Sequence, residues 1–156
     1  MEITPSVHGF RVWRVIDSLL YSAQTDVCWP PKEWLHASCW PDASRECQHH
    51  LAPDDCCDCG IHLARTYADL EAFLPTIKPA TPIFGCASGG GHILPSLQRH
   101  KSWVEFPDRG WRVEYARPSA LFVSNKLDLA AIACRYDTPV IDPPADPTSP
   151  CPGPPG

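Results

Sequence analysis

The sequence predicts an α+β fold, with a small antiparallel β-sheet, two short helices and a loop-rich lobe at roughly residues 28–62. Three observations favour this class. Short runs of β-branched and aromatic residues, separated by turn residues, are typical of strands. Two other stretches repeat apolar residues at helical spacing. The lobe itself is rich in Pro, Asp and Cys and has no sustained periodicity, so no apolar core of its own is expected.

The strand predictions rest on two parts of the chain. Residues 9–16, Gly-Phe-Arg-Val-Trp-Arg-Val-Ile, predict an opening strand, and residues 19–23 predict a second one. The clearest hairpin lies later, where residues 102–106 and 111–115 flank a turn that ends at Gly110. Gly110 can adopt the left-handed conformation that closes such a turn, so we expect these two runs to pair.

Two helices are expected from capping residues and apolar spacing. Thr66 is a predicted N-cap, because its hydroxyl can accept a hydrogen bond from a backbone N–H of the first turn. That helix should end near Pro75, which lacks an N–H group. Ser124 or Asn125 is expected to cap the second helix. Its apolar stripe would consist of Leu127, Ala130, Ala131 and Cys134.

The 156 residues predict one domain over residues 1–141 and a disordered proline-rich tail over residues 142–156. No apolar run reaches the 18 residues that indicate a membrane-spanning helix. The N-terminus has neither the basic nor the apolar region of a secretory signal, so we expect a cytoplasmic location. The net charge of −5 disfavours a general nucleic-acid binder, because such binding depends on neutralising phosphates.

The distribution of the nine cysteines predicts a metal site. Five of them fall within residues 39–59, together with His49 and His50. A metal site gathers its ligands in this way, whereas a disulfide framework distributes its bridges through the fold. In a reducing compartment the cluster therefore favours zinc over disulfides or incidental free thiols. The lobe is predicted to be ordered by Zn²⁺ in place of an apolar core.

The spacing leaves the four ligands open. Cys56-x-x-Cys59 and Cys57-x-Cys59 each provide a tight knuckle that can place two sulfurs on one ion, and Gly60 follows directly. The other two ligands would come from Cys39 or Cys47 and from His49 or His50. A segment with so many Cys and His candidates has little need of water as a ligand, which favours a structural ion over a catalytic one.

Four motifs carry a resemblance to known sequences: Ala37-Ser-Cys39, His50-Leu-Ala-Pro53, Cys57-Asp-Cys59-Gly-Ile-His62 and Gly110-Trp-Arg-Val-Glu-Tyr-Ala-Arg-Pro118. With them the chain resembles a set of small actinobacterial and actinophage proteins that share a C-x-C-G-I-Y knuckle and a G-[WY]-R-x-E-Y-A-x-P strand. The resemblance implies no particular activity. It implies the zinc ligands Cys39, His50, Cys57 and Cys59, and a phage or mobile-element setting. This chain departs from the pattern at His62 and in its additional Cys47 and Cys56.

The favoured function is a non-enzymatic interaction or regulatory module that binds a macromolecular partner. Basic and aromatic residues interleave around the predicted hairpin, a pattern that can grip single-stranded nucleic acid or a protein surface. Acidic residues are mixed among them, which favours a protein partner or, more simply, a hairpin with solvated charges. The candidate partner-binding residues are Arg99, Lys101, Trp103, Arg109, Trp111 and Arg112.

The alternative is a hydrolase-type enzyme that uses an open zinc site or Cys86. In Gly85-Cys86-Ala-Ser-Gly-Gly-Gly-His92 a thiolate could pair with an imidazole, but the string lacks both the Lys-Ser/Thr of a P-loop and the Rossmann spacing. The simpler interpretation is a turn or bulge that joins two strands, with Cys86 buried as a small apolar residue. Cys151, in the tail, is expected to be an unpaired, exposed thiol.

Overall fold

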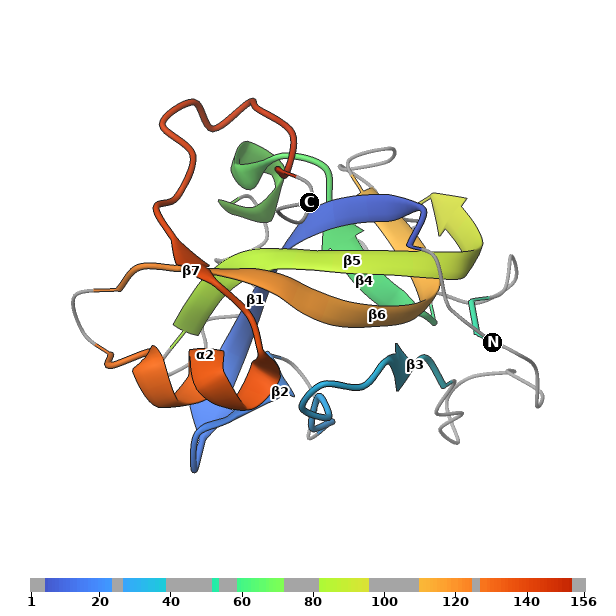
Figure 1. Cartoon of the computed structure of the whole chain (residues 1–156). Coiled ribbons are helices and arrows are strands. Elements are labelled where there is room, and N and C mark those ends of the chain that lie inside the picture. The colour runs from blue at the N-terminus through green and yellow to red at the C-terminus, as the bar shows by residue number, and fades with distance from the viewer. Residues whose placement is uncertain are drawn as a thin grey trace.

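The computed structural model describes residues 5–23, 27–38, 52–53, 59–71, 82–95, 110–124 and 127–152 (Figure 1). Within these ranges the chain forms one mixed sheet of seven strands. The strands are β1 (Val7–Ile16), β2 (Leu19–Ser22), β3 (Leu35–His36), β4 (Ile61–Ala64), β5 (Pro82–Pro95), β6 (Gly110–Phe122) and β7 (Val140–Ile141). Two helical segments accompany the sheet, residues 67–71 and α2 (Ala130–Tyr136).

The predicted α+β class is wrong, because strands make up far more of the described chain than helices do. The largest difference lies in β5 and β6, which have 14 and 13 residues and pair along most of their lengths. The glycine-rich string 85–92 lies inside β5 and does not form a turn between two short strands. Register shifts at Cys86/Ala87 and at Gly90/Ile93 accommodate it, so the expected irregularity is present as bulges within one strand.

Four strands form a closed ring. β1 pairs with β5, β5 with β6, β6 with β4, and β4 again with β1, where Phe10 lies opposite Ala64. Closure presses the short strand β4 between β1 and β6. A Cβ atom on Gly9 would lie 2.6 Å from the Leu63 Cβ atom, and one on Gly110 would clash with the Leu63 carbonyl oxygen. Only glycine permits such close backbone approach at these two positions.

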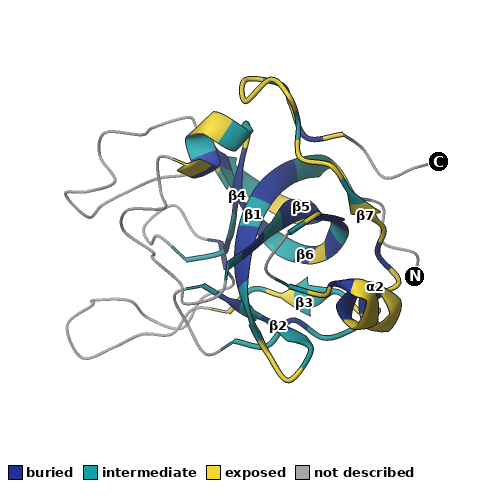
Figure 2. Ribbon diagram, turned by 90° about the vertical axis from the view of Figure 1, so that its left-hand side faces the viewer, coloured by how far each residue is buried: buried dark blue, intermediate teal, exposed yellow. Residues whose placement is uncertain are grey.

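The core consists of two apolar clusters that share the strands of the ring. Figure 2 shows that buried residues are concentrated on these strands. In the larger cluster, Trp13 and Trp29 are fully buried and meet edge to face, with ring centroids 5.4 Å apart. In the smaller cluster, Phe10 packs against Phe122 and against Tyr67 of the first helical segment. Each cluster therefore joins the sheet to a segment outside the ring.

The structure confirms the two N-terminal strands and corrects the predicted hairpin. β1 and β2 match the runs expected at 9–16 and 19–23, and they pair as an antiparallel hairpin. Residues 111–113, in contrast, pair with β4 along one edge and with residues 93–95 of β5 along the other. A strand has only two hydrogen-bonding edges, so the predicted pairing of this segment with residues 102–106 is wrong. Residues 102–106 themselves lie outside the described ranges.

The first predicted helix cap is confirmed, whereas the second helix begins later than expected. The Thr66 hydroxyl accepts a hydrogen bond from the Asp69 N–H at 3.1 Å and donates one to the Asp69 carboxylate at 2.8 Å. The predicted continuation toward Pro75 lies outside the described residues. α2 has Leu129 at its N-cap without a side-chain cap, and it buries Ile132 and Tyr136. Neither described helix is long and apolar enough to cross a membrane.

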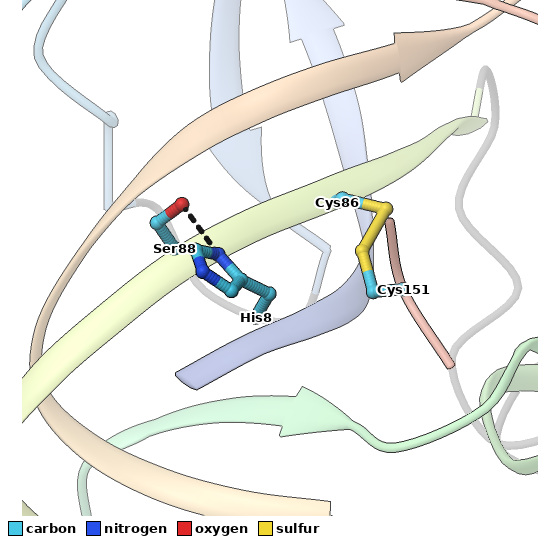
Figure 3. The surroundings of a disulfide bond; sticks show 4 residues. All are labelled: His8, Cys86, Ser88 and Cys151. Atoms are coloured by element: carbon cyan, nitrogen blue, oxygen red, sulfur yellow. Dashed lines mark hydrogen bonds between the residues drawn. A yellow bond between two sulfur atoms is a disulfide. The ribbon is translucent and has the colours of Figure 1, made fainter. Parts of the chain in front are cut away.

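The C-terminal segment is attached to the body of the protein as far as residue 152. The Pro147 carbonyl oxygen accepts a hydrogen bond from the Ala68 N–H at 2.9 Å, and Pro150 forms an isolated bridge with Thr66. Cys151 is buried and forms a disulfide with Cys86 of β5 (Figure 3). Residues 142–152 thus lack the disorder that their composition predicts, and Cys151 is not the exposed thiol expected. Composition contains no information about this covalent bond.

We expect Cys151→Ser to release the C-terminal segment and to lower the free energy of unfolding by about 2–4 kcal/mol, because the disulfide joins residues 65 apart in the sequence. Urea denaturation would measure the loss, and limited proteolysis would show new cleavage after residue 141. Cys134→Ser, which changes an exposed thiol on α2, is the matched control. Identical denaturation curves for the two variants would contradict the expectation.

The Tyr136 side chain joins α2 to β2 and to the segment that follows β2. Its hydroxyl donates a hydrogen bond to the Trp29 carbonyl oxygen at 2.6 Å and accepts one from the Leu20 N–H at 2.8 Å. Burial raises the pKa of Tyr136 to about 12. Tyr136→Phe removes both bonds and should lower the free energy of unfolding by about 1–3 kcal/mol near neutral pH.

The raised pKa also predicts the direction of a pH effect. In the unfolded chain the Tyr136 hydroxyl ionises near pH 10, so its stabilising effect is complete below about pH 10 and is lost as the pH rises toward about 12. The stability difference between the wild type and Tyr136→Phe should therefore shrink over this range. Urea denaturation of both proteins across the alkaline range measures it, and a constant difference would rule out the effect.

Candidate metal centre

The two ends of the cysteine-rich lobe meet on one edge of β6. At the end of β3, His36 lies opposite Tyr115, and the Ala37 N–H donates a hydrogen bond to the Glu114 carbonyl oxygen at 2.7 Å. β4 begins at Ile61, opposite Val113. The chain therefore leaves the edge of β6 beside Glu114 and returns to it beside the preceding residue. The intervening residues 38–60 begin and end at the same place in the fold.

Two of the predicted ligands, Cys39 and Cys59, are near this edge of β6 along the chain. Cys39 follows Ala37 by two residues, and Cys59 precedes Ile61 by two residues. Each cysteine is therefore separated from the shared edge by only two residues of chain. Of the predicted ligands, Cys59 is described, whereas Cys39, His50 and Cys57 lie outside the described ranges, as do the alternatives Cys47, His49 and Cys56.

A third part of the lobe packs against the same point. Gly60 has a φ of +116°, a backbone conformation that favours glycine, directly after the predicted knuckle. A Cβ atom at Gly60 would lie 2.9 Å from the Cβ atom of Pro53 and 3.1 Å from that of Arg112. Pro53, which is buried, follows the predicted ligand His50 by three residues. The described segments next to His50 and Cys59 therefore meet beside Arg112, and the segment before Cys39 contacts β6 two residues further on, at Glu114.

Arg112 lies in the interior of the protein, beside the predicted knuckle. It was expected to contact a partner from the surface, and this is wrong, because its side chain is fully buried. Its Nη1 atom donates a hydrogen bond to the Cys59 carbonyl oxygen, and its Nε atom donates one to the Pro95 carbonyl oxygen, both at 3.1 Å. The guanidinium group thus ties the knuckle to the end of β5. In the sequence, Arg112 stands between Trp111 and Val113. This alternation predicts that the arginine faces solvent while its two neighbours face the core.

A second arginine contacts β4, the strand that follows the knuckle. Arg11 donates from Nη1 to the His62 carbonyl oxygen at 2.7 Å and from Nη2 to the Ser22 hydroxyl at 3.1 Å. Its guanidinium carbon lies 4.9 Å from the centre of the Trp29 ring, and burial lowers its pKa to about 10. From the sequence, no role was predicted for Arg11, and Arg112 was assigned to the surface. The sequence signal for a buried arginine was its place between two apolar residues of a strand: Arg11 stands between Phe10 and Val12, and Arg112 between Trp111 and Val113.

Of the other predicted partner-binding residues, the structure describes only Trp111. Trp111 is half-buried, and the Arg65 guanidinium carbon lies 5.0 Å from the centre of its ring. The proposed basic surface at Arg99, Lys101, Trp103 and Arg109 lies outside the described residues. Within the described ranges, no three His, Cys, Asp or Glu residues are grouped as metal ligands.

The Cys86–His92 pair considered for catalysis is not formed. Cys86 is fully buried and its sulfur is bonded to that of Cys151, whereas His92 is exposed further along β5. Figure 3 shows the neighbouring polar contact, in which the His8 ring nitrogen Nδ1 lies 2.9 Å from the Ser88 hydroxyl oxygen. Thiolate catalysis by Cys86 would require a reduced and accessible sulfur, and the structure provides neither condition.

Arg112→Met is expected to lower the free energy of unfolding by about 3 kcal/mol, because two backbone carbonyl groups lose a charged donor inside the protein. Thermal or urea denaturation measures this loss. Arg135→Met is the control, since Arg135 is exposed and makes one longer contact, 3.3 Å to the Asp17 carbonyl oxygen. Equal stability of the two variants would show that the buried guanidinium group is not a structural tie.

Comparison with known proteins adds no information on this candidate site. No protein-family model, no curated protein and no solved structure matches the chain.

Proposed function

We propose that this protein is a small zinc-binding interaction module in which Cys39, His50, Cys57 and Cys59 hold a structural Zn²⁺ ion and the ordered lobe supports binding of a macromolecular partner. The observation that carries the proposal is the meeting of the two ends of residues 38–60 beside Val113 and Glu114. A loop that starts and ends at one place needs an internal interaction to fix its path, and a metal ion bound by its cysteines and histidine supplies one.

The composition of the lobe supports a structural role for the ion. Residues 39–59 contain few large apolar residues and many Cys, Asp and His, so apolar burial alone is a weak ordering force for them. Zinc binding in small domains provides an apparent free energy of about 10–16 kcal/mol, which couples directly to folding. Four Cys and His ligands complete the tetrahedral coordination of zinc and leave no open position for water.

The charges around the knuckle agree with this proposal. Three thiolates and one Zn²⁺ ion carry a net charge of −1. The buried cation of Arg112 is hydrogen-bonded to the carbonyl oxygen of Cys59, and Arg11 is hydrogen-bonded to that of His62. A buried cation near a negatively charged cluster is favourable, because the two charges attract strongly where water is excluded.

For the partner, the net charge of −5 favours a protein over nucleic acid. We assign the contact to Arg99, Lys101, Trp103 and Arg109, which follow β5 in the sequence, together with the half-buried Trp111. Arg112 is excluded from this surface by its burial. A regulatory role in a phage or mobile-element setting completes the proposal. The Cys86–Cys151 disulfide disfavours the reducing cytoplasm expected from the sequence, so the cytoplasm is not part of it.

The metal site is tested by comparing the full-length wild type with Cys39→Ser, Cys59→Ser and Cys134→Ser. Elemental analysis should find about one zinc per chain in the wild type and in Cys134→Ser, whose thiol is exposed on α2, and much less in the other two. X-ray absorption should show only sulfur and nitrogen ligands. Absence of zinc from the wild type would contradict the metal centre, and a bound water would favour hydrolytic chemistry in its place.

The partner is tested separately by capture from native lysate on the immobilised protein. We expect a protein to be retained in a manner that resists nuclease and is lost after treatment with a chelator. Loss of the captured material on nuclease treatment would contradict a protein partner. Retention after complete zinc removal would contradict the role of the lobe.

A further inference from the structure

The edge of β6 that carries the lobe has an opening further along. In order, this edge pairs with β4, β3 and β7. The last pair with β3 is Ala116 with Leu35, and the first pair with β7 is Leu121 with Val140. Between them, within the described chain, residues 117–120 have a strand neighbour only on the β5 side. Figure 2 places β3, α2 and β7 around this side of β6.

A cleft of about 320 Å³ lies at this opening. It is lined by Arg117, Pro118 and Ser119 of β6, by Lys32 from the segment before β3, and by Asp137 after α2. An additional peptide strand does not suit the opening. The exposed stretch of edge is short, β3 and β7 flank it, and Pro118 has no N–H group to offer to a strand. The cleft suits a compact ligand.

Ser119 is the extra residue of a β-bulge and belongs to the wall of this cleft. Cys86 lies opposite Ala120 and Ala87 lies opposite Pro118, so Ser119 has no partner residue in the ladder. A bulge redirects the side chain of the extra residue, and bulges are frequent beside binding sites. The Ser119 hydroxyl oxygen is shielded from solvent and makes no hydrogen bond to any part of the chain that the structure describes. A buried hydroxyl without a partner is unfavourable unless a ligand supplies one.

The charged residues at the cleft are predominantly positive. Lys32 and Arg117 provide two cations against the single carboxylate of Asp137. The Arg117 guanidinium carbon lies 4.6 Å from the centre of the Trp34 ring, so stacking holds this group in a defined orientation. An oriented guanidinium group presents paired N–H donors that match the oxygens of a phosphate. The prolines Pro5, Pro118 and Pro139 add apolar surface.

We propose that this cleft binds a small organic phosphate monoester. Arg117 and Lys32 contact the phosphate, the Ser119 hydroxyl donates a hydrogen bond to it, and the organic group lies against the prolines. The cleft volume falls at the lower end of the range for small-molecule sites, which suits a compact ligand of this kind. The site is separate from the proposed metal centre, because none of the residues that line the cleft lies within residues 38–60.

The experiment is a calorimetric titration of the full-length protein with phenyl phosphate. Binding should be saturable, and Arg117→Ala should weaken it by about tenfold, since a charged hydrogen-bonding group is lost. Arg65→Ala is the matched control, because Arg65 is also exposed and stacks on a tryptophan, 5.0 Å from the centre of the Trp111 ring, away from the cleft. Equal weakening by both variants, or no saturable binding by the wild type, would overturn the proposal.

Two further variants separate binding from stability. Ser119→Ala should weaken phenyl phosphate binding severalfold without lowering the melting temperature, because the hydroxyl makes no hydrogen bond to the described residues. Asp137→Asn should strengthen binding, because it removes a like charge from the cleft. Weaker binding by Asp137→Asn, or unchanged binding by Ser119→Ala, would contradict the assigned roles. Inorganic phosphate should bind less tightly than phenyl phosphate, and equal affinity would overturn the part of the proposal that concerns the organic group.

Discussion

A β-strand can form hydrogen bonds along only two edges, and the structure depends on how β6 uses both of them. One edge is paired with β5 over most of its length. The other edge is divided among β4, β3 and β7, which come from three distant parts of the sequence. The division closes the ring at β4, brings the ends of the cysteine-rich lobe together and leaves an opening at Ser119. The fold, the candidate metal centre and the cleft are consequences of this one strand.

The elements that could be predicted from sequence are those whose determinants are local. β1 and β2 form a hairpin between adjacent runs, and the Thr66 cap depends on a residue three positions away. β6 could not be predicted in the same way, because its partners are chosen by packing between distant segments. Its residues 111–113 show a hairpin pattern, yet both of their edges are taken by β4 and β5. For residues 111–113, pairing with distant strands outweighed the local hairpin pattern.

The same distinction between local and long-range determinants applies to the candidate site. Clustering of Cys and His residues predicts a metal ion, because ligand type and spacing are local properties, and this remains a prediction. The positions of Arg11 and Arg112 were not predictable, since the identity of a strand residue does not reveal which of its faces becomes internal. The bond between Cys86 and Cys151 was equally hidden, because the two residues are 65 positions apart and belong to no shared motif.

The same covalent bond determines how the molecule would respond to mechanical load. A force applied at the C-terminus does not reach α2 and β7 first, although they are its nearest elements in the sequence. It passes through Cys151 into the middle of β5, which is flanked by β1 and β6. The hydrogen bonds that join β5 to β1 and to β6 would then resist the force together. α2 and β7 would carry no force, because they lie within the loop of chain that the disulfide closes.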